Sequence, residues 1–275
     1  MLTRRLKRIF QNDGQTLIVA FDHGLTEGPA KGMEAPAGIL MKLAASGADA
    51  ILTSYGIATR FTDEIAALGL ILRLDVGGTK LGKMGPGSQY FRVEDALRIG
   101  ADAVAVSAFP GTPQEKETLE TLAKVIMEAH QWGLPVMAEM QPGGFDAGPD
   151  VCTPEAIRLS ARIAAEFGAD WVKVPYTNQF KQVVQSCYVP AVMLGGVRVN
   201  DQRRLFEMVW DAKHAGAAGI AVGRNIFQAD DPGAVVKALE AILHQNADVD
   251  EACVIYDQAH ASFNKSGPVS GSFRE

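Results

Sequence analysis

The sequence contains few of the residues that build disulfide frameworks or metal sites. Its 275 residues include three cysteines and five histidines. Cys152, Cys187 and Cys253 lie far apart without a CxxC pair, and the histidines show neither HxH nor HxxxH spacing. Paired spacings of these kinds mark zinc sites, and sets of paired cysteines mark disulfide scaffolds. We therefore expect no metal and no other cofactor, and chemistry that proceeds without them.

The sequence also lacks long apolar runs and a strong excess of one charge. No stretch of about 20 apolar residues could span a bilayer, and no apolar signal core opens the chain. The formal charge is −6, and the basic run from Arg4 to Arg8 is short. A mildly acidic chain is not typical of general nucleic-acid or anionic-membrane binders. We predict a cytoplasmic protein with no nucleic-acid and no membrane partner.

What the sequence does contain is a repeated unit, in which an amphipathic stretch ends at glycine and a short apolar strand follows. Glycine commonly ends helices because it adopts the left-handed conformation. Together with apolar runs that follow proline or glycine, the repeat predicts eight strands, near residues 16, 48, 69, 102, 134, 170, 189 and 218. Eight strands that alternate with helices indicate an α/β fold, a closed (β/α)8 TIM barrel. An open doubly wound sheet is the alternative, but no GxGxxG follows the first strand.

Two flanking segments fall outside the eight units. Apolar residues at helical spacing predict a helix within residues 1–12 that closes the bottom of the barrel. Residues 232–245 are predicted to form the last barrel helix, and residues 249–260 an extra C-terminal helix. Residues 265–275, rich in serine and glycine, are predicted to be a flexible tail. No linker interrupts the pattern, so we expect one domain over residues 1–275.

Lys173 is unusual because it lies in the middle of a short apolar strand. A lysine is almost never fully buried without a partner or a function. Burial favours the neutral amine, which is the form that attacks a carbonyl carbon. In the alternative, only the stem of the lysine is covered and its ammonium reaches water. The strand alone favours this alternative, and the other strands decide between the two.

Carboxylates lie near the ends of two other predicted strands, and TIM barrels hold their active sites at the C-terminal strand ends. Asp22 and His23 end the first strand, and the two-residue alternation allows only one of them to face the barrel mouth. We favour Asp22. Glu139 lies in the fifth strand, next to the strand of Lys173. It can act as a proton shuttle, or it can be a buried ion-pair partner without a chemical role.

Glycines follow the third, seventh and eighth strands. Those after the third strand either let a ligand approach the backbone or form an ordinary tight turn. Glycines after strands seven and eight build the phosphate site of many TIM barrels, and arginines can add bidentate contacts. An amine, carboxylates and a phosphate site together predict a lyase that acts on a phosphorylated ketone through an iminium. The predicted phosphate-binding residues are Gly195, Gly196, Arg198, Gly223 and Arg224.

Four motifs resemble the archaeal-type class I aldolase family, also called DeoC/LacD-type or DhnA-type. They are the AFDHG of residues 20–24, the DWVK of residues 170–173, Gly195-Gly196 and the AVGRNIFQ of residues 221–228. The similarity extends from about Arg4 to Tyr256, and its two ends look especially like the branch that processes autoinducer-2 phosphate. The resemblance implies a (β/α)8 barrel, a Schiff-base lysine at Lys173 and a catalytic aspartate at Asp22. It also implies phosphate binding after strands seven and eight, and ring-like homo-oligomers.

Two positions depart from the family pattern. Family members that cleave fructose bisphosphate or make aminodideoxy-heptulosonate carry a proton-donating tyrosine where this sequence has Gln141. An amide has no usable acidity, so Glu139 is our candidate for proton transfer, with Tyr176 or a water molecule behind it. Arg198 stands where the family has a lysine. Both changes weaken the expectation that fructose bisphosphate is the substrate.

We predict a class I aldolase, a carbon–carbon lyase, for a phosphorylated keto sugar or related phosphoketone. Lys173 would form the iminium, Asp22 would assist, and Glu139 and Gln141 would complete the catalytic group. One alternative keeps Lys173 but transfers an acyl group of a phosphorylated dione to coenzyme A. The other is a barrel that binds a phosphorylated metabolite without turnover, and such a barrel would need no lysine in the middle of a strand.

Overall fold

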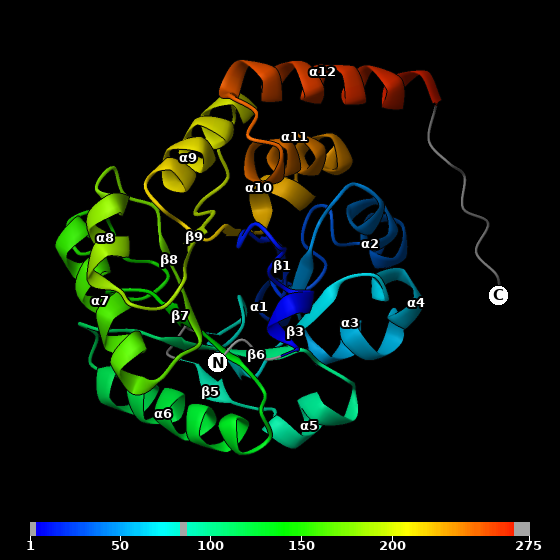
Figure 1. Ribbon diagram of the computed structural model, residues 1–275. Coiled ribbons are helices and arrows are strands. Elements are labelled where there is room, and N and C mark those ends of the chain that lie inside the picture. Colours follow the sequence, from blue (N-terminus) through cyan, green and yellow to red (C-terminus); the bar gives the residue numbers. More distant parts are fainter. Residues whose placement is uncertain (1–3, 83–86, 267–275) are drawn as a thin grey trace.

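Eight parallel strands close into a barrel with the order β1-β10-β9-β8-β7-β6-β3-β2. The computed structural model describes residues 4–82 and 87–266. Helices form a ring around the strands (Figure 1). The predicted TIM barrel is confirmed, and the open doubly wound alternative is wrong. The barrel strands are β1 (Leu17–Phe21), β2 (Ala50–Thr53), β3 (Gly69–Arg73), β6 (Ala103–Ala108), β7 (Val136–Met140), β8 (Trp171–Pro175), β9 (Ala191–Leu194) and β10 (Ile220–Val222).

The helices begin and end where the sequence supplies caps. The hydroxyl oxygen of Thr153 accepts a hydrogen bond from Ala156 N, which starts α7, and Gly168 ends α7 with φ +98°. An antiparallel pair, β4 (Asp75–Val76) and β5 (Ser88–Gln89), follows β3. The helices are α1 (Gly24–Glu27), α2 (Pro36–Ala45), α3 (Tyr55–Arg60), α4 (Thr62–Ile65), α5 (Val93–Arg98), α6 (Glu115–Gln131), α7 (Pro154–Phe167), α8 (Phe180–Ser186), α9 (Gln202–His214), α10 (Arg224–Phe227), α11 (Pro232–His244) and α12 (Val249–Ser266).

The aspartates of the repeated Gly-Ala-Asp sequence hold the lower edge of the barrel together. Each precedes a strand and accepts a hydrogen bond from a backbone N–H at the start of the neighbouring strand. These N–H groups lie at the strand ends, where a carboxylate can supply the missing acceptor. The repeat therefore specifies strand pairing as well as helix ends. The bonds are Leu17 N to Asp49 at 2.6 Å, Leu70 N to Asp102 at 2.9 Å and Val136 N to Asp170 at 2.8 Å.

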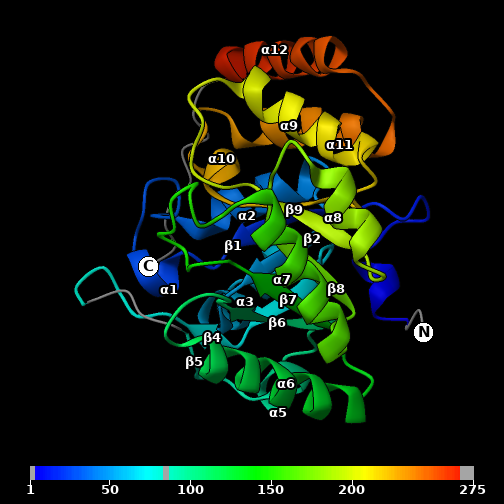
Figure 2. The same ribbon diagram turned by 90° about the vertical axis from the view of Figure 1, so that its left-hand side faces the viewer.

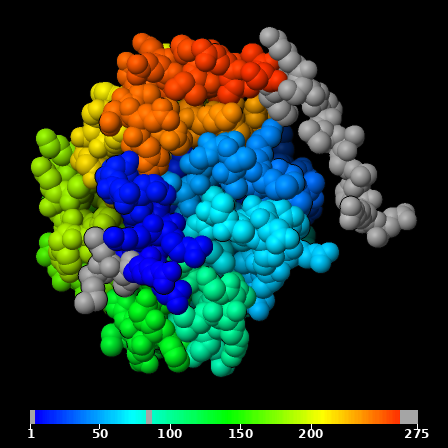
Figure 3. Space-filling model, turned by 45° about the vertical axis from the view of Figure 1, so that its right-hand side comes forward, coloured from blue at the N-terminus to red at the C-terminus, as the bar shows by residue number. Residues whose placement is uncertain are grey.

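The N-terminal segment closes the bottom of the barrel, but it is not the predicted helix over residues 1–12. Its described part contains one 3-10 turn, Leu6–Arg8. Leu6 and Ile9 are buried, and the ring of Phe10 meets the edge of Trp171 at 5.7 Å between centroids. A segment this short gains little from its own helical hydrogen bonds, so the insertion of these side chains determines its path. Figure 3 shows this segment in dark blue at the molecular surface.

The C-terminal helices lie outside the barrel. The predicted last barrel helix corresponds to α11, and α12 lies across α9 and α11 as the outermost element (Figure 2). Helix α12 continues to Ser266, so the prediction of a tail from residue 265 is wrong for its first two residues. Residues 249–266 contain no glycine or proline, and the sequence Gly267-Pro268 follows them. The rest of the predicted tail lies outside the described residues.

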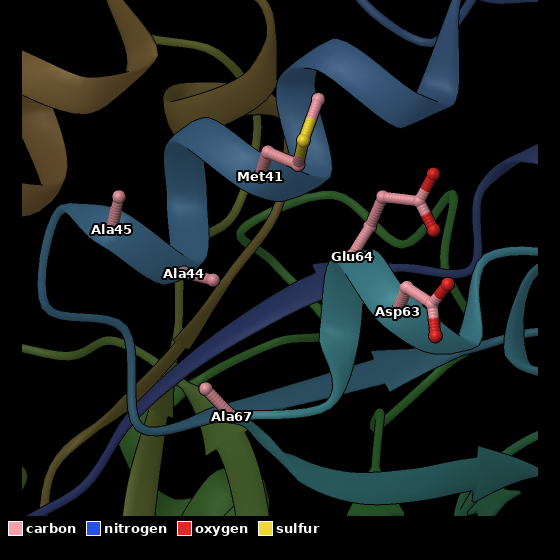
Figure 4. A pocket seen from close by; sticks show the side chains of 6 residues that line it. All are labelled: Met41, Ala44, Ala45, Asp63, Glu64 and Ala67. Carbon is pink, nitrogen blue, oxygen red and sulfur yellow. The ribbon is translucent and has the colours of Figure 1, made fainter.

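Two features of the described residues concern the outer surface. No helix among them is long and apolar enough to cross a membrane. A hollow lies between α2 and α4 on the outer wall of the barrel (Figure 4). Its lining contains no strand residue, so it is separate from the barrel mouth. The lining residues are Met41, Ala44, Ala45, Asp63, Glu64 and Ala67.

His244 links the end of α11 to two loops at the bottom of the barrel. Its Nδ1 lies 2.7 Å from Asp13 Oδ2, and its Nε2 lies 3.0 Å from Asp49 Oδ2. Burial alone would lower the pKa of His244, but the hydrogen bonds to Asp49 and Asp13 and their charges raise it from 6.5 to about 9. The stabilisation by His244 is therefore complete below pH 6.5, and it is lost as the pH rises through 9.

We expect His244→Gln to lower the free energy of unfolding by roughly 1–3 kcal/mol at pH 6, and by much less at pH 9.5. Urea unfolding of both proteins at a series of pH values measures this difference. Gln131→Ala at the exposed end of α6 is the control, because it removes no titratable group, and it should cost the same at both pH values. A His244→Gln effect that does not change with pH would contradict the linkage.

Candidate active site

The barrel interior changes from apolar to charged along its axis. Residues at alternate strand positions face inward, and the lower ones form a cluster that the N-terminal Leu6 and Ile9 complete. Two residues further along β3, β7 and β8, the inward positions carry Arg73, Glu139 and Lys173. We call this level the charged layer. The apolar strand residues below it are Ile18, Ala20, Ala50, Leu52, Ile71, Ala103, Ala105, Met137, Trp171, Val192 and Ala221.

Lys173 and Glu139 are direct neighbours in the charged layer. Strands β7 and β8 pair with Glu139 opposite Lys173. Lys173 Nζ lies 2.7 Å from Glu139 Oε1, and the two residues are 4% and 2% exposed. The ammonium of Lys173 therefore does not reach bulk water, and the alternative of a lysine with only its stem covered is wrong. A buried amine beside a carboxylate has an acceptor for its proton within hydrogen-bond distance.

Arg73 connects Glu139 to a second carboxylate, and the sequence interpretation missed it. Its Nη2 donates to Glu139 Oε2, and its Nε donates to Asp22 Oδ2 at 2.8 Å. Its Nη1 donates to Asp75 Oδ1 at 3.3 Å and to Ser107 Oγ at 2.9 Å. Like Lys173, Arg73 is a charged residue in an apolar strand, and this signal could have identified it.

The carboxylates of the charged layer differ in their protonation. Burial alone would raise the pKa of Asp22, but the surrounding positive charges, led by that of Arg73, lower it from 3.8 to about 2. Burial also opposes ionisation of Glu139, but the charges of Lys173 and Arg73 hold its pKa below the usual range. Burial outweighs the effect of Arg73 at Asp75 and raises the pKa of that carboxyl. Asp22 and Glu139 are therefore ionised at neutral pH.

His23 and Tyr176 lie outside the charged layer. The His23 ring packs against Phe227 at 5.1 Å between centroids, and its Nδ1 is 3.6 Å from Asp22 Oδ1. Burial lowers the pKa of His23. The hydroxyl of Tyr176 lies 3.2 Å from Asp211 Oδ2 on α9. The prediction that Tyr176 stands behind Glu139 is therefore wrong, because residue 176 alternates to the outer face of its strand.

Gln141 lies above Glu139, one inward position closer to the barrel mouth. The residue is 7% exposed, and its Nε2 lies 4.0 Å from Cys152 Sγ. Its Oε1 is buried and has no hydrogen-bond partner among the described residues. A buried amide oxygen without a partner is costly unless a ligand supplies the donor.

The glycine loops after β9 and β10 lie together, and Asn225 joins them. Arg224 Nη2 donates to Gly196 O at 3.2 Å. The Asn225 side chain donates to Gly195 O at 2.8 Å and to Val197 O at 3.1 Å, and it accepts from Val199 N at 2.7 Å. The sequence interpretation missed Asn225, although a polar residue within the AVGRNIF motif was a signal for it.

The predicted phosphate-binding residues differ in their surroundings. Gly195 is required by packing, because an added Cβ would lie 2.7 Å from Val222 Cγ1. Gly223 is buried, whereas Gly196 has φ +65° and open space around it. Arg198 is exposed on the turn after β9. Within the described part of the chain, no group of three or more His, Cys, Asp and Glu residues could hold a metal ion.

Comparisons with known proteins indicate the family to which the chain belongs. The DeoC/LacD family aldolase profile matches residues 16–229. An uncharacterized aldolase of Saccharolobus solfataricus is 33% identical over 91% of this chain and 97% of its own. A 2-amino-3,7-dideoxy-D-threo-hept-6-ulosonate synthase of Halobacterium salinarum is 36% identical over 91% of this chain and 94% of its own.

A solved structure is similar over almost the same length. It is an archaeal fructose-1,6-bisphosphate aldolase whose catalytic lysine is covalently bound to the carbinolamine intermediate of its substrate. It is 33% identical to this chain, with a TM-score of 0.79, and the match covers 88% of this chain and 99% of the other. The chain belongs to the DeoC/LacD family of aldolases, and it is a class I aldolase.

Proposed function

We propose that this class I aldolase cleaves or forms a carbon–carbon bond in a phosphorylated keto sugar or related phosphoketone, with Lys173 as the Schiff-base residue. The contact between Lys173 Nζ and Glu139 Oε1 at 2.7 Å carries the proposal. It places a nucleophile and a proton acceptor together in a buried layer. The covalently bound lysine of the archaeal aldolase supports the same chemistry here.

Glu139 moves the protons of imine formation in this proposal. Its carboxylate accepts a proton from Lys173 Nζ, and the neutral amine attacks the ketone carbon. Glu139 passes this proton to the carbonyl oxygen and takes a second one from the nitrogen of the adduct, which gives the neutral carbinolamine. Glu139 then delivers the second proton to the carbinolamine hydroxyl, which leaves as water, and the iminium forms. The lowered pKa of Glu139 keeps its carboxylate ionised and in contact with Lys173 Nζ before the substrate binds.

Asp22 takes part in the cleavage step. One of its oxygens is held by Arg73, and the other, Oδ1, is not. In this proposal, Asp22 Oδ1 accepts a proton from a hydroxyl group of the substrate. This hydroxyl group is on the carbon that becomes the aldehyde. As this proton leaves, the carbon–carbon bond breaks, and its electron pair moves into the iminium to form an enamine. Protonation of the enamine carbon and hydrolysis then release the second product and free Lys173.

Gln141 binds the substrate rather than transferring a proton. An amide has no usable acidity, so it does not supply the function of the family tyrosine. Its partnerless Oε1 is suited to accept a hydrogen bond from a substrate hydroxyl or amine above Glu139. The proton transfers are thereby left to Glu139 and to water.

The phosphate group is proposed to bind where the glycine loops meet. Gly196 and Gly223 offer backbone N–H groups, and Arg224 and Arg198 add guanidinium groups. Gly195 lets the loop pack closely on Val222, and its own N–H donates to Ala221 O at 3.4 Å. The fructose bisphosphate of the archaeal relative supports a phosphorylated substrate. A ring-like homo-oligomer remains an expectation from the family resemblance, and a cytoplasmic location remains an expectation from the sequence.

Borohydride reduction in the presence of dihydroxyacetone phosphate, a three-carbon phosphoketone, tests the proposal. Mass spectrometry of peptides should find the reduced adduct on Lys173. Absence of an adduct, or an adduct on another lysine only, would contradict the proposed role. Activity should also survive EDTA, whereas a loss that zinc restores would indicate metal-dependent chemistry. A product that forms only with coenzyme A would favour the thiolase alternative.

Asn225→Asp provides a test of the phosphate loops. The substitution keeps the shape of the side chain but replaces a donor to two carbonyl oxygens with an acceptor. Each lost buried hydrogen bond costs about 1 kcal/mol or more, so we expect KM for a phosphorylated substrate to rise at least about tenfold. Steady-state kinetics measures the effect.

The control for Asn225→Asp is Asn246→Asp on the outer surface. Asn246 has φ +60°, a conformation that aspartate also tolerates, and it contacts Lys213. This variant should keep the KM of the unaltered protein. If Asn225→Asp also kept its KM, the loops would not bind the phosphate.

A further inference from the structure

Arg73 contributes more contacts to the charged layer than any other side chain in it. Its side chain is 7% exposed. Three of its nitrogens donate to four acceptors, which belong to Asp22, Asp75, Ser107 and Glu139. A guanidinium is planar and always charged, so its N–H groups fix the directions in which these acceptors lie. A buried ionic group of this size is costly, and packing alone would be served by an apolar residue.

Arg73 binds the two carboxylates of the proposed mechanism, those of Asp22 and Glu139, through different nitrogens. Glu139 binds Nη2 through Oε2, which leaves Oε1 directed at Lys173 Nζ. Asp22 binds Nε through Oδ2, which leaves Oδ1 outside the contact with Arg73. Each carboxylate therefore has one oxygen held by Arg73 and one available for chemistry. The remaining nitrogen, Nη1, is held by Asp75 and Ser107, and the Asp75 carboxylate also accepts from Ser107 N at 3.0 Å.

The balance of charge in the charged layer also points to a role for Arg73. Asp22, Asp75 and Glu139 supply three carboxylates, and Arg73 and Lys173 are the cations that contact them. When Lys173 gives up its proton to become a nucleophile, Arg73 is the cation of this set that remains. Glu139 has then taken up the proton, and the charge of Arg73 keeps the neighbouring Asp22 ionised for the cleavage step.

We propose that Arg73 is a positioning residue for imine formation, which holds one oxygen of Glu139 and directs the other toward Lys173. This inference rests on the proposed function of Lys173 and Glu139. Arg73 itself exchanges no proton and touches no reacting atom. Its effect passes through Glu139, and in the cleavage step through Asp22. Loss of Arg73 should therefore change the pH dependence of imine formation as well as its rate.

The test measures the rate of adduct formation at Lys173, with dihydroxyacetone phosphate and trapping by cyanoborohydride, as a function of pH. In Arg73→Gln, Glu139 loses one of its two cations, so its pKa rises. We expect the acid limb of the profile to move upward by about one pH unit or more, and the maximal rate to fall at least about tenfold. If Arg73 had a purely structural role, its loss would lower the amount of active protein equally at every pH. The acid limb of the pH profile would then stay in place.

Arg73→Lys keeps the charge but not the planar set of donors. Its acid limb should stay near that of the unaltered protein, while its maximal rate should fall about tenfold because Glu139 is no longer oriented. If Arg73→Gln does not fold, Arg73→Lys provides the test. An unchanged maximal rate in Arg73→Lys would then overturn the proposal. The control is Arg98→Gln, which removes an arginine paired with Asp95 on the outer surface and should change neither rate nor limb.

Failure of this inference can be distinguished from failure of the proposed function. If the unaltered protein forms no adduct on Lys173, the proposed function itself is wrong. If it forms the adduct and a folded Arg73→Gln gives the same pH profile and rate, only the role of Arg73 is overturned. Circular dichroism and thermal unfolding establish that each variant is folded before its rates are compared.

Discussion

Lys173→Met is expected to lower kcat/KM by at least about 10⁴-fold and to abolish the borohydride adduct. Loss of an enzyme's covalent nucleophile commonly has effects of this size, because the remaining groups cannot form the intermediate. Methionine is close to lysine in length and has no amine. Steady-state kinetics and peptide mass spectrometry, with and without dihydroxyacetone phosphate and borohydride, measure the two effects.

The fold should survive Lys173→Met, because Glu139 keeps a buried cation. Its second oxygen still contacts Arg73, so the substitution does not leave a carboxylate without a partner. Lys181→Met is the matched control, since Lys181 lies on the helix that follows the same strand and is exposed. This control should keep full activity and the adduct. Substantial turnover by Lys173→Met would exclude Lys173 as the Schiff-base residue.

The sequence predicted the positions of Lys173 and Glu139 well because strand order in a TIM barrel follows chain order. Once the strands were counted, the fifth and the sixth had to be neighbours, and the structure pairs Glu139 with Lys173. The same counting placed the glycine loops after the seventh and eighth strands side by side. These conclusions required only the repeat and the alternation of inward positions.

Contacts between non-adjacent strands could not be predicted in the same way. Arg73 lies on β3, separated from β7 by β6 in the barrel order. Its long side chain reaches across the interior to Glu139 and Asp22, and no sequence spacing encodes this reach. Asn225 was missed for a similar reason, since its partners belong to a loop some 30 residues earlier in the chain. Alternation alone would have excluded Tyr176, which lies three positions from Lys173.

The prediction of an N-terminal helix shows how packing overrides local pattern. Leu6 and Ile9 have helical spacing, and the structure buries both of them. At the bottom of the barrel, however, these side chains pack in one buried cluster with Trp171 and close the interior. One 3-10 turn is enough to direct them inward. The apolar pattern therefore identified the buried face correctly, while the helix length depended on a tertiary contact.

Glu139→Gln is expected to lower kcat/KM by about 10²–10⁴-fold, the range that general acid–base groups contribute. The amide has nearly the same shape but cannot accept the proton of Lys173 or return one to the carbinolamine hydroxyl. It also removes the negative charge that two buried cations, Lys173 and Arg73, contact. The rate of adduct trapping should therefore fall together with turnover, and stopped-flow or quench experiments with borohydride measure both.

Glu139→Asp separates the proton-transfer role from simple ion pairing. Aspartate keeps the carboxylate but is one methylene shorter, so we expect a fall of about 10–100-fold, smaller than that of the amide. Glu166→Gln, an exposed helix position paired with Arg162, is the control and should retain full activity. If Glu139→Gln stayed within a few-fold of the unaltered enzyme, the carboxylate would be only an ion-pair partner. Proton transfer would then have to come from water.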